Sequence, residues 1–481
     1  MPGEGGMKGR AGFVLGILFF LFIMVAPFDI DMKIRGAMAT LFLCATWWVT
    51  EAIPVYATAL LPAVMLPLLG ILPLQEALNQ YAHRIIFLFL GGFLIARAMI
   101  KWGLDRRIAI AVLSRGGKNA RVLVLHFMIV TAFLSAFISN TATTAMMLPI
   151  GMAVLIHMEG KKKTEYGKAL MLGIAYAATI GGVATLIGTP PNAIFAGFSE
   201  NLLGREITFF EWLKIGLPFS AIMLPIAWKF LMWRYDVKDE EMNYGNYIVK
   251  EKNKLGKMGR EERLTVLIFI MVAVLWITHP FWDAIPFQPL HILQERMDDA
   301  VIAMLGALLL FIIPVNVREW KFVLSWDDAM KIPIGILILF GGGLCLGKGL
   351  FESGAAEWIA SVIPLISLPI IIIIMVALVS SFLSEVASNT AVANMLMPIF
   401  IAMAGNAGMN PYVFLIPATL SCSIAFMFPI STPPNAIVYS SGHLKMEDMV
   451  KNGFMLHLIG LVVVVALTYF LTGKIVGMFP V

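Results

Sequence analysis

Stretches of roughly 18 or more residues with almost no charge recur along this chain of 481 residues. A helix of that length crosses the hydrocarbon core of a bilayer, which is about 30 Å thick. Strands of a membrane β-barrel would alternate polar and apolar residues, whereas 370–374 is a run of isoleucine. Charged residues make up only 14% of the chain, against roughly 25% in an average soluble domain. The sequence therefore predicts an all-α polytopic membrane protein.

The connections between apolar segments differ in charge. Lysine and arginine are concentrated in 101–121, 159–168 and 234–263. The connections 199–211, 279–298 and 351–357 are acidic or neutral. The positive-inside rule places the basic set in the cytoplasm. These loops also explain the pI of about 9.0, so no nucleic-acid partner is expected.

We predict about 11 transmembrane helices, of which the first lies in a leading segment, 1–31. The predicted crossings are about 12–29, 35–51, 54–72, 85–102, 168–198, 212–234, 263–280, 299–315, 333–351, 411–441 and 454–478. An odd number of crossings leaves the N-terminus in the cytoplasm and the C-terminus outside. The expected location is the inner (plasma) membrane.

The chain contains two copies of one pattern. FLSAFISNTATTAMMLPI at 133–150 and FLSEVASNTAVANMLMPI at 382–399 are identical at ten of eighteen aligned positions. Similar pairs occur at 91–103 with 342–354, and at 187–194 with 430–437. One duplicated unit explains all three pairs, and we assign 32–240 and 263–481 to its two copies, with a cytoplasmic linker at 241–262. Five crossings per unit turn the second copy upside down, as in transporters with inverted repeats.

Each Ser-Asn-Thr triplet is predicted to lie at the tip of a re-entrant hairpin. The segment of about 121–157 has basic flanks at both ends, so it enters and leaves from the cytoplasmic side. Two full crossings would give the same flanks, but Asn and Thr at the turn, followed by Pro149, favour a tip that lines a cavity. The second hairpin, about 362–404, has flanks poor in Lys and Arg, as expected for entry from outside. The two hairpins would then point at each other.

The sequence Thr-Pro-Pro-Asn occurs at 189–192 and again at 432–435. Tandem prolines remove two amide donors and exclude the preceding residue from helical geometry, so a helix breaks there. The break exposes carbonyl oxygens, which suit a hard cation such as Na⁺, and amide N–H groups, which suit a carboxylate. A structural kink is the usual explanation of such prolines. Their duplication beside duplicated Ser-Asn-Thr triplets favours a binding site in two halves.

Charged side chains are almost absent from these motifs. Neither contains Lys or Arg, and the nearest carboxylate is Glu385, where the first copy has Ala136. Bound Na⁺ and helix N-termini can supply the positive charge that an anion requires. For Glu385, a packing role and a functional role are equally compatible with the sequence.

No motif of an enzyme stands out. The three cysteines, Cys44, Cys345 and Cys422, lie in apolar segments without metal-ligand spacing. The seven histidines form neither a zinc motif nor a triad, and most lie near segment ends. We expect no enzymatic activity, no disulfide and no organic cofactor.

Together with WWVTEAIP at 47–54, the paired motifs resemble the divalent anion/sodium symporter (DASS) family over nearly the whole chain. The resemblance implies transport of di- or tricarboxylates, in some members sulfate, with Na⁺ or by exchange. It also implies a homodimer in which a transport domain slides against a fixed scaffold, which is an elevator mechanism.

The resemblance further implies the site residues. One Na⁺ site would comprise Ser135, Ser139, Asn140 and the backbone at Gly188. A second Na⁺ site would comprise Ser384, Ala387, Asn389 and the backbone near Ser431. The substrate carboxylates would contact Asn140, Thr141, Thr189, Ser388, Asn389, Thr390 and Thr432.

The preferred interpretation is Na⁺-coupled symport of C4-dicarboxylates such as succinate, malate and fumarate. A dicarboxylate exchanger that needs no Na⁺ is the main alternative, and citrate or sulfate remain open as substrates. An anion channel is disfavoured because opposed hairpins that cap one buried site favour alternating access. A membrane-embedded enzyme has the least support.

Overall fold

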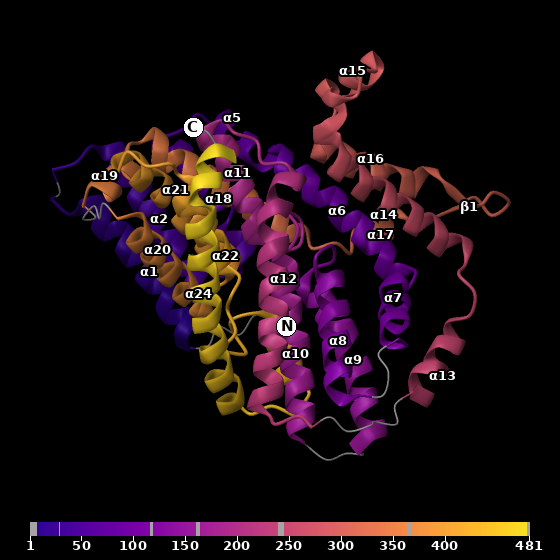
Figure 1. Ribbon diagram of the computed structural model, residues 1–481. Coiled ribbons are helices and arrows are strands. Elements are labelled where there is room, and N and C mark those ends of the chain that lie inside the picture. The colour runs from indigo at the N-terminus through magenta and orange to yellow at the C-terminus, as the bar shows by residue number, and fades with distance from the viewer. Residues whose placement is uncertain are drawn as a thin grey trace.

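A computed structural model describes residues 7–27, 29–115, 119–159, 164–238, 245–362 and 368–478 (Figure 1). Seven helical segments in these ranges are long and apolar enough to cross a membrane: Met7–Val25, Leu74–Lys101, Phe209–Arg234, Arg260–Ala284, Ile334–Glu352, Pro369–Val386 and Met446–Leu471. Shorter apolar helical segments are Val55–Leu68, Ala120–Ser135, Asp299–Ile312 and Tyr412–Cys422. The prediction of a helical membrane protein is confirmed.

The first half of the chain contains α1 (Met7–Val25), α2 (Met32–Thr50), α3 (Val55–Thr58), α4 (Leu61–Leu68), α5 (Leu74–Asn79), η1 (Gln80–Ala82), α6 (Arg84–Lys101), α7 (Leu104–Leu113), α8 (Ala120–Ser135), α9 (Asn140–Glu159), α10 (Glu165–Val183), α11 (Pro190–Leu203) and α12 (Phe209–Arg234). A linker helix follows, α13 (Gly245–Leu255).

The second half contains α14 (Arg260–Thr278), η2 (His279–Ala284), α15 (Gln288–Arg296), α16 (Asp299–Ile312), β1 (Pro314–Asn316), β2 (Lys321–Phe322), α17 (Trp326–Ala329), α18 (Ile334–Glu352), α19 (Ala355–Val362), α20 (Pro369–Val386), α21 (Asn389–Asn406), α22 (Tyr412–Cys422), α23 (Pro433–Tyr439) and α24 (Met446–Met478).

The ribbon of β1 and β2 departs from the all-α prediction. The two strands pair antiparallel, with Pro314 opposite Phe322. Directly after β2, the carbonyl oxygen of Val323 accepts hydrogen bonds from Lys101 Nζ and Trp102 Nε1, each 2.9 Å long. The ribbon is too short to leave a hydrophobic periodicity in the sequence, and its position depends on these contacts with the end of α6.

The two halves of the chain interlock. In Figure 1, α6, α14 and α16 lie together on the right, α1, α2 and α20 on the left, and α10 and α12 between them. Helix α10 packs against α8, α9 and α12 of its own half, but also against α23 of the other half. Helix α22 packs against α20, α21 and α24, and against α11 of the first half. The core is therefore shared between the halves.

Ion pairs join α7 to the linker helix α13 and to the start of α14. Arg106 Nη2 lies 2.6 Å from Glu251 Oε2, and Arg107 Nη2 lies 2.9 Å from Glu262 Oε2 at the start of α14. Hydrogen bonds from Lys254 and Arg106 lower the pKa of Glu251 below its usual value. This part of the linker thus packs as a fixed element.

Candidate functional site

The first Ser-Asn-Thr triplet lies at the turn between α8 and α9. Helix α8 ends at Ser135 and α9 begins at Asn140, so the triplet spans the end of the turn. The Ser135 hydroxyl is buried and lies 2.6 Å from Asn140 Oδ1 and 2.7 Å from the carbonyl oxygen of Ala178 in α10. Ser139 Oγ accepts a 3.3 Å hydrogen bond from the amide of Ala142. Hydrogen bonds within the turn, and one to α10, thus hold this tip.

The second triplet occupies the equivalent turn between α20 and α21. Ala387 follows the last residue of α20 in extended geometry, Ser388 is the N-cap of α21, and Asn389 begins that helix. Asn389 Oδ1 is buried without a hydrogen-bond partner among the described residues. The hydroxyl of Ser384 is buried as well, beside the thiol of Cys422. The asparagine side-chain oxygen of the second tip therefore has no partner among the described residues, whereas the equivalent oxygen of the first tip, Asn140 Oδ1, accepts a hydrogen bond.

The Thr-Pro-Pro-Asn motifs lie at breaks between helices. One break separates α10 from α11, and the other separates α22 from α23. Thr189 has φ −143° and ψ 145°, and Thr432 has φ −141° and ψ 147°. Each threonine is extended because the following proline excludes helical geometry, and each proline then starts a helix.

An asparagine side chain holds the backbone of each break. Asn192 Nδ2 donates to the carbonyl oxygens of Thr185 at 2.8 Å and Gly182 at 3.2 Å. Asn435 Nδ2 donates to those of Phe428 at 3.0 Å and Ala425 at 3.4 Å. The side chain thus replaces part of the lost helical hydrogen bonding. The sequence analysis did not assign this role to either asparagine.

The first tip and the first break are in close contact. A Cβ atom at Gly182 would overlap Asn140 Oδ1, and one at Gly188 would overlap the carbonyl oxygen of Gly182 and lie 3.1 Å from that of Ala136. The carbonyl of Ala136 also accepts a hydrogen bond from the Thr185 hydroxyl. Neutral oxygens therefore converge here from a hydroxyl, an amide and the backbone. Such oxygens are suitable ligands for a hard cation.

The second tip is joined to its break through Glu385. The Glu385 carboxylate accepts hydrogen bonds from the amide of Phe426 at 2.8 Å, the amide of Met427 at 3.1 Å and the hydroxyl of Ser431 at 2.7 Å. His457 Nδ1 of α24 lies 3.1 Å from Glu385 Oε1. His457 is fully buried. Only the tertiary structure pairs it with Glu385.

Contacts between the halves join the helices that begin at the four motifs. Helix α9, which follows the first tip, packs against α23, and α21, which follows the second tip, packs against α11. The ring of Tyr176 in α10 lies 5.1 Å from that of Phe426 in the second break. Ser199 Oγ of α11 lies 2.6 Å from Tyr412 Oη of α22. The helix that begins at each tip thus packs against a broken helix of the other half.

The predicted substrate contacts differ in exposure. Thr189, Thr390 and Thr432 are buried, with 3%, 8% and 6% of their surface exposed. Ser388 and Asn389 are half-buried, whereas Thr141 is exposed. The Thr432 hydroxyl accepts a 3.4 Å hydrogen bond from the amide of Asn435. Thr141 is thus the most accessible of the predicted contacts.

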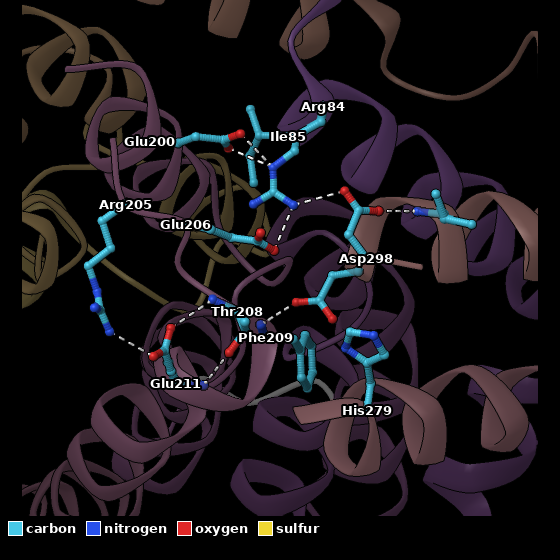
Figure 2. A network of polar contacts seen from close by, with 12 residues as sticks. Arg84, Ile85, Glu200, Arg205, Glu206, Thr208, Phe209, Glu211, His279 and Asp298 are labelled. Atoms are coloured by element: carbon cyan, nitrogen blue, oxygen red, sulfur yellow. Dashed lines mark hydrogen bonds and ion pairs between the residues drawn. The ribbon is translucent and has the colours of Figure 1, made fainter. Parts of the chain in front are cut away.

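A separate polar network joins α6, α11 and α16. Figure 2 shows the Arg84 guanidinium between three carboxylates, with Nε 2.7 Å from Glu200 and Nη1 2.7 Å from Glu206 and 2.9 Å from Asp298. An adjoining cavity of about 890 Å³ is lined in part by Glu206, Asp298 and Arg205. None of the predicted site residues lines this cavity. Sequence reasoning noted only the connections 199–211 and 279–298, not their pairing with Arg84.

Comparison with curated proteins gives relatives across nearly the full length. The chain is 38% identical to the sodium-dependent dicarboxylate transporter SdcS of Staphylococcus saprophyticus, over 97% of this chain and 92% of that protein. It is also 38% identical to SdcS of Staphylococcus aureus, with the same coverage.

Solved structures with the same fold are distant in sequence. MtrF of Neisseria gonorrhoeae, described as illuminating a class of antimetabolite efflux pumps, has a TM-score of 0.58 at 12% identity, covering 95% of this chain and 94% of its own. The Alcanivorax borkumensis YdaH transporter also has a TM-score of 0.58 at 12% identity, covering 96% and 98%. These likenesses concern the fold alone.

A comparison with sequence models of protein families identifies the family of this chain. The model of the sodium:sulfate symporter transmembrane region matches residues 9–478. The expected DASS resemblance is confirmed, and so is the expectation of a transporter rather than an enzyme. This chain belongs to the sodium:sulfate symporter family of membrane transporters.

Proposed function

We propose that this protein is a secondary active transporter that carries C4-dicarboxylates such as succinate, malate and fumarate together with Na⁺. The SdcS relatives, 38% identical over nearly the whole chain, are sodium-dependent dicarboxylate transporters by name. The observation that supports this function best is that the helix beginning at each Ser-Asn-Thr tip packs against the helix beginning at the Thr-Pro-Pro-Asn break of the other half. A ligand with two similar ends matches a site with two similar halves.

Na⁺ is the proposed coupling ion, and its ligands are neutral oxygens. In the first half these are Ser135, Ser139, Asn140 and the backbone at Gly188. In the second half they are Ser384, Ala387, Asn389 and the backbone near Ser431. The closeness of Asn140 to Gly182, and the free Oδ1 of Asn389, support these assignments. Half-helix termini and unwound carbonyls bind Na⁺ in other transporters with broken helices.

The dicarboxylate is proposed to bind between the tips. Its carboxylates would contact Asn140, Thr141, Thr189, Ser388, Asn389, Thr390 and Thr432. Helices α9, α11 and α21 begin at or beside these residues, and their N-terminal amides carry partial positive charge. Bound Na⁺ would add the remaining charge, so the site needs no lysine or arginine. This arrangement makes anion binding dependent on the cation.

We further propose an elevator mechanism in a homodimer. The two halves, 32–240 and 263–481, would be inverted repeats with about 11 crossings in all. The re-entrant hairpins α8–α9 and α20–α21 would move with the broken helices against a scaffold that includes α6, α14 and α16. The protein would lie in the plasma membrane with its N-terminus in the cytoplasm and its C-terminus outside. The basic connections at 101–121 and 234–263 support this orientation.

The decisive experiment is uptake of labelled succinate into proteoliposomes under an inward gradient of Na⁺, K⁺ or choline. We expect uptake into vesicles without internal substrate, and only with Na⁺. Uptake that requires internal dicarboxylate with every cation would instead establish an exchanger. Absence of succinate uptake under all conditions, with uptake of sulfate or citrate, would overturn the choice of substrate.

A further inference from the structure

We infer that Glu385 is a positioning residue that orients Ser431 toward the second Na⁺ site and supplies a fixed negative charge beside it. This inference rests on the proposed Na⁺-coupled function. It assigns to one half of the site a group that the other half lacks, because Ala136 occupies the equivalent position. The two cation sites would therefore differ in affinity.

Glu385 is buried, and its hydrogen-bond partners come from several segments of the chain. Only 1% of the Glu385 surface is exposed. Two backbone amides and one hydroxyl donate hydrogen bonds to its oxygens. A carboxylate buried among apolar helices is costly unless such partners are present. So many converging donors favour a functional role over simple packing.

Ser431 connects this carboxylate to the break. Its hydroxyl lies 2.7 Å from Glu385 Oε2 and 2.8 Å from the Glu385 carbonyl oxygen, so its only proton points at Glu385. The lone pairs of the hydroxyl then point away from Glu385, where they can bind a cation. Without the carboxylate, the Glu385 carbonyl oxygen would be the one remaining acceptor described for this proton, so the orientation of the hydroxyl would be less tightly defined.

The amides of Phe426 and Met427 are fixed by the same carboxylate. Both residues lie between α22 and α23, where the chain is not helical and its amides lack helical partners. Glu385 thus determines the course of the backbone that leads to Ser431. In the first half, Asn192 and the Thr185 hydroxyl hold the break, and no carboxylate takes part in the hydrogen bonds described there.

His457 of α24 contacts the Glu385 carboxylate. Its ring is fully buried, with Nδ1 3.1 Å from Glu385 Oε1, and it packs 4.9 Å from the ring of Phe382. The pair joins α24 to α20. This contact limits the rotamers of Glu385 and keeps its second oxygen directed at Ser431.

The side-chain oxygens of the two tip asparagines differ in their hydrogen bonding. At the first tip, Asn140 Oδ1 is 2.6 Å from the Ser135 hydroxyl. At the second tip, Asn389 Oδ1 has no such partner among the described residues. Asn389 Oδ1 is thus an acceptor without a protein partner, four positions after the residue that orients the Ser431 hydroxyl, and a cation is a suitable partner for such an oxygen. The second half is therefore the one prepared to bind Na⁺ tightly.

The test is a Na⁺ titration of thermal stability on the purified full-length protein without substrate, with K⁺ as the ionic-strength control. Glu385→Gln keeps the size of the side chain but removes its charge and one acceptor. We expect the Na⁺ midpoint to rise about ten- to hundredfold, as for loss of a charge-assisted hydrogen bond. Glu385→Asp, which keeps the charge, should fall between wild type and Glu385→Gln. In proteoliposomes, the KM for succinate at saturating Na⁺ should change less than the Na⁺ midpoint.

Two further variants keep the test decisive. Ser431→Gly gives the second half the residue of the first half, Gly188, and should also raise the Na⁺ midpoint even if Glu385→Gln fails to fold. Glu251→Gln removes another buried carboxylate, in α13, and should leave the midpoint unchanged. If the role of Glu385 were merely structural, Glu385→Gln would have a lower melting temperature than wild type but the same Na⁺ midpoint.

The possible outcomes separate the two proposals. If wild type is stabilised by Na⁺ and both Glu385→Gln and Ser431→Gly keep its midpoint, the role of Glu385 is overturned and the transport function stands. If wild type shows neither Na⁺ stabilisation nor Na⁺-dependent uptake, both proposals are overturned.

Discussion

Asn192 and Asn435, 243 positions apart in the chain, make the same hydrogen bonds in the two halves of the protein. Each side-chain amide donates to the carbonyl oxygens seven and ten positions before it, at 2.8 and 3.2 Å for Asn192 and at 3.0 and 3.4 Å for Asn435. Both Oδ1 atoms are buried without a partner among the described residues. An asparagine side chain thus stabilises the non-helical backbone of both breaks in the same way.

Replacing either of these asparagines by aspartate should disrupt its break. The carboxylate cannot donate, and it would face carbonyl oxygens at hydrogen-bond distance. We expect succinate uptake to fall by about tenfold or more, because leaving a buried polar group without its hydrogen bond costs roughly 1–3 kcal/mol. Proteoliposome uptake at saturating Na⁺ measures the effect. Asn316→Asp is the matched control, because Asn316 Oδ1 acts there as an acceptor of amide hydrogen bonds; equal losses in all three variants would contradict the prediction.

Asn140→Ala and Asn389→Ala should each abolish transport while the protein stays folded and keeps the oligomeric state of the wild type. Each change removes a proposed ligand oxygen at a tip rather than packing volume in the core. Uptake, with size-exclusion chromatography of the same preparations, tests the prediction. Asn406→Ala, at the exposed end of α21, should behave as wild type. Normal uptake by either tip variant would overturn the site assignment.

Gly182→Ala should impair transport because it displaces the side chain of Asn140. A Cβ atom at position 182 would overlap the Asn140 side-chain oxygen, so the tip must shift away from the break. We expect uptake to fall by about tenfold or more, with a weaker response of thermal stability to Na⁺. Gly405→Ala is the control, since a Cβ atom there meets nothing within 4 Å. Wild-type uptake by Gly182→Ala would show that Asn140 tolerates displacement.

Arg84→Met should destabilise the junction of α6, α11 and α16 shown in Figure 2. The change leaves Glu200 and Asp298 without their common cation, and both side chains are less than a third exposed. We expect a loss of roughly 1–3 kcal/mol, seen as a lower melting temperature in detergent. Lys451→Met breaks an exposed ion pair within α24 and should cause no measurable change. If the two variants melt alike, the network contributes nothing to stability.

Asp328 should make stability depend on pH. Burial alone would raise the pKa of this carboxyl, but hydrogen bonds from Lys101 and Ser325 lower it well below its usual range. A folded-state pKa below the unfolded value, about 3.9, gives stability that is fully present above that pH and is lost as the pH falls toward the folded pKa.

Asp328→Asn should therefore lower the melting temperature by a constant amount between pH 5 and 8 and by a smaller amount below about pH 4. Melting curves of both proteins over this range provide the measurement. Asp327→Asn, at an exposed position of the same short helix, serves as the control. A penalty that grows on acidification would have the wrong sign for this mechanism.

The sequence by itself determined the helical membrane character, the duplication and the places where helices break. Long uncharged runs leave a chain few alternatives, because backbone polar groups in a bilayer must be satisfied within the helix. Tandem prolines end helices through local sterics, so the beginnings of α11 and α23 at Pro190 and Pro433 could be read directly. These features depend on neighbours in the sequence.

The tertiary structure decided which of these elements meet. Only the fold pairs His457 with Glu385, 72 positions away, or places Arg84 between carboxylates from α11, the following loop and α16. The sequence left the role of Glu385 open, because a buried carboxylate is explained by its donors, and its donors lie more than 40 positions away in the non-helical segment between α22 and α23. Periodicity and motifs report local geometry, whereas hydrogen bonds between distant segments follow from how helices of both halves pack in one core.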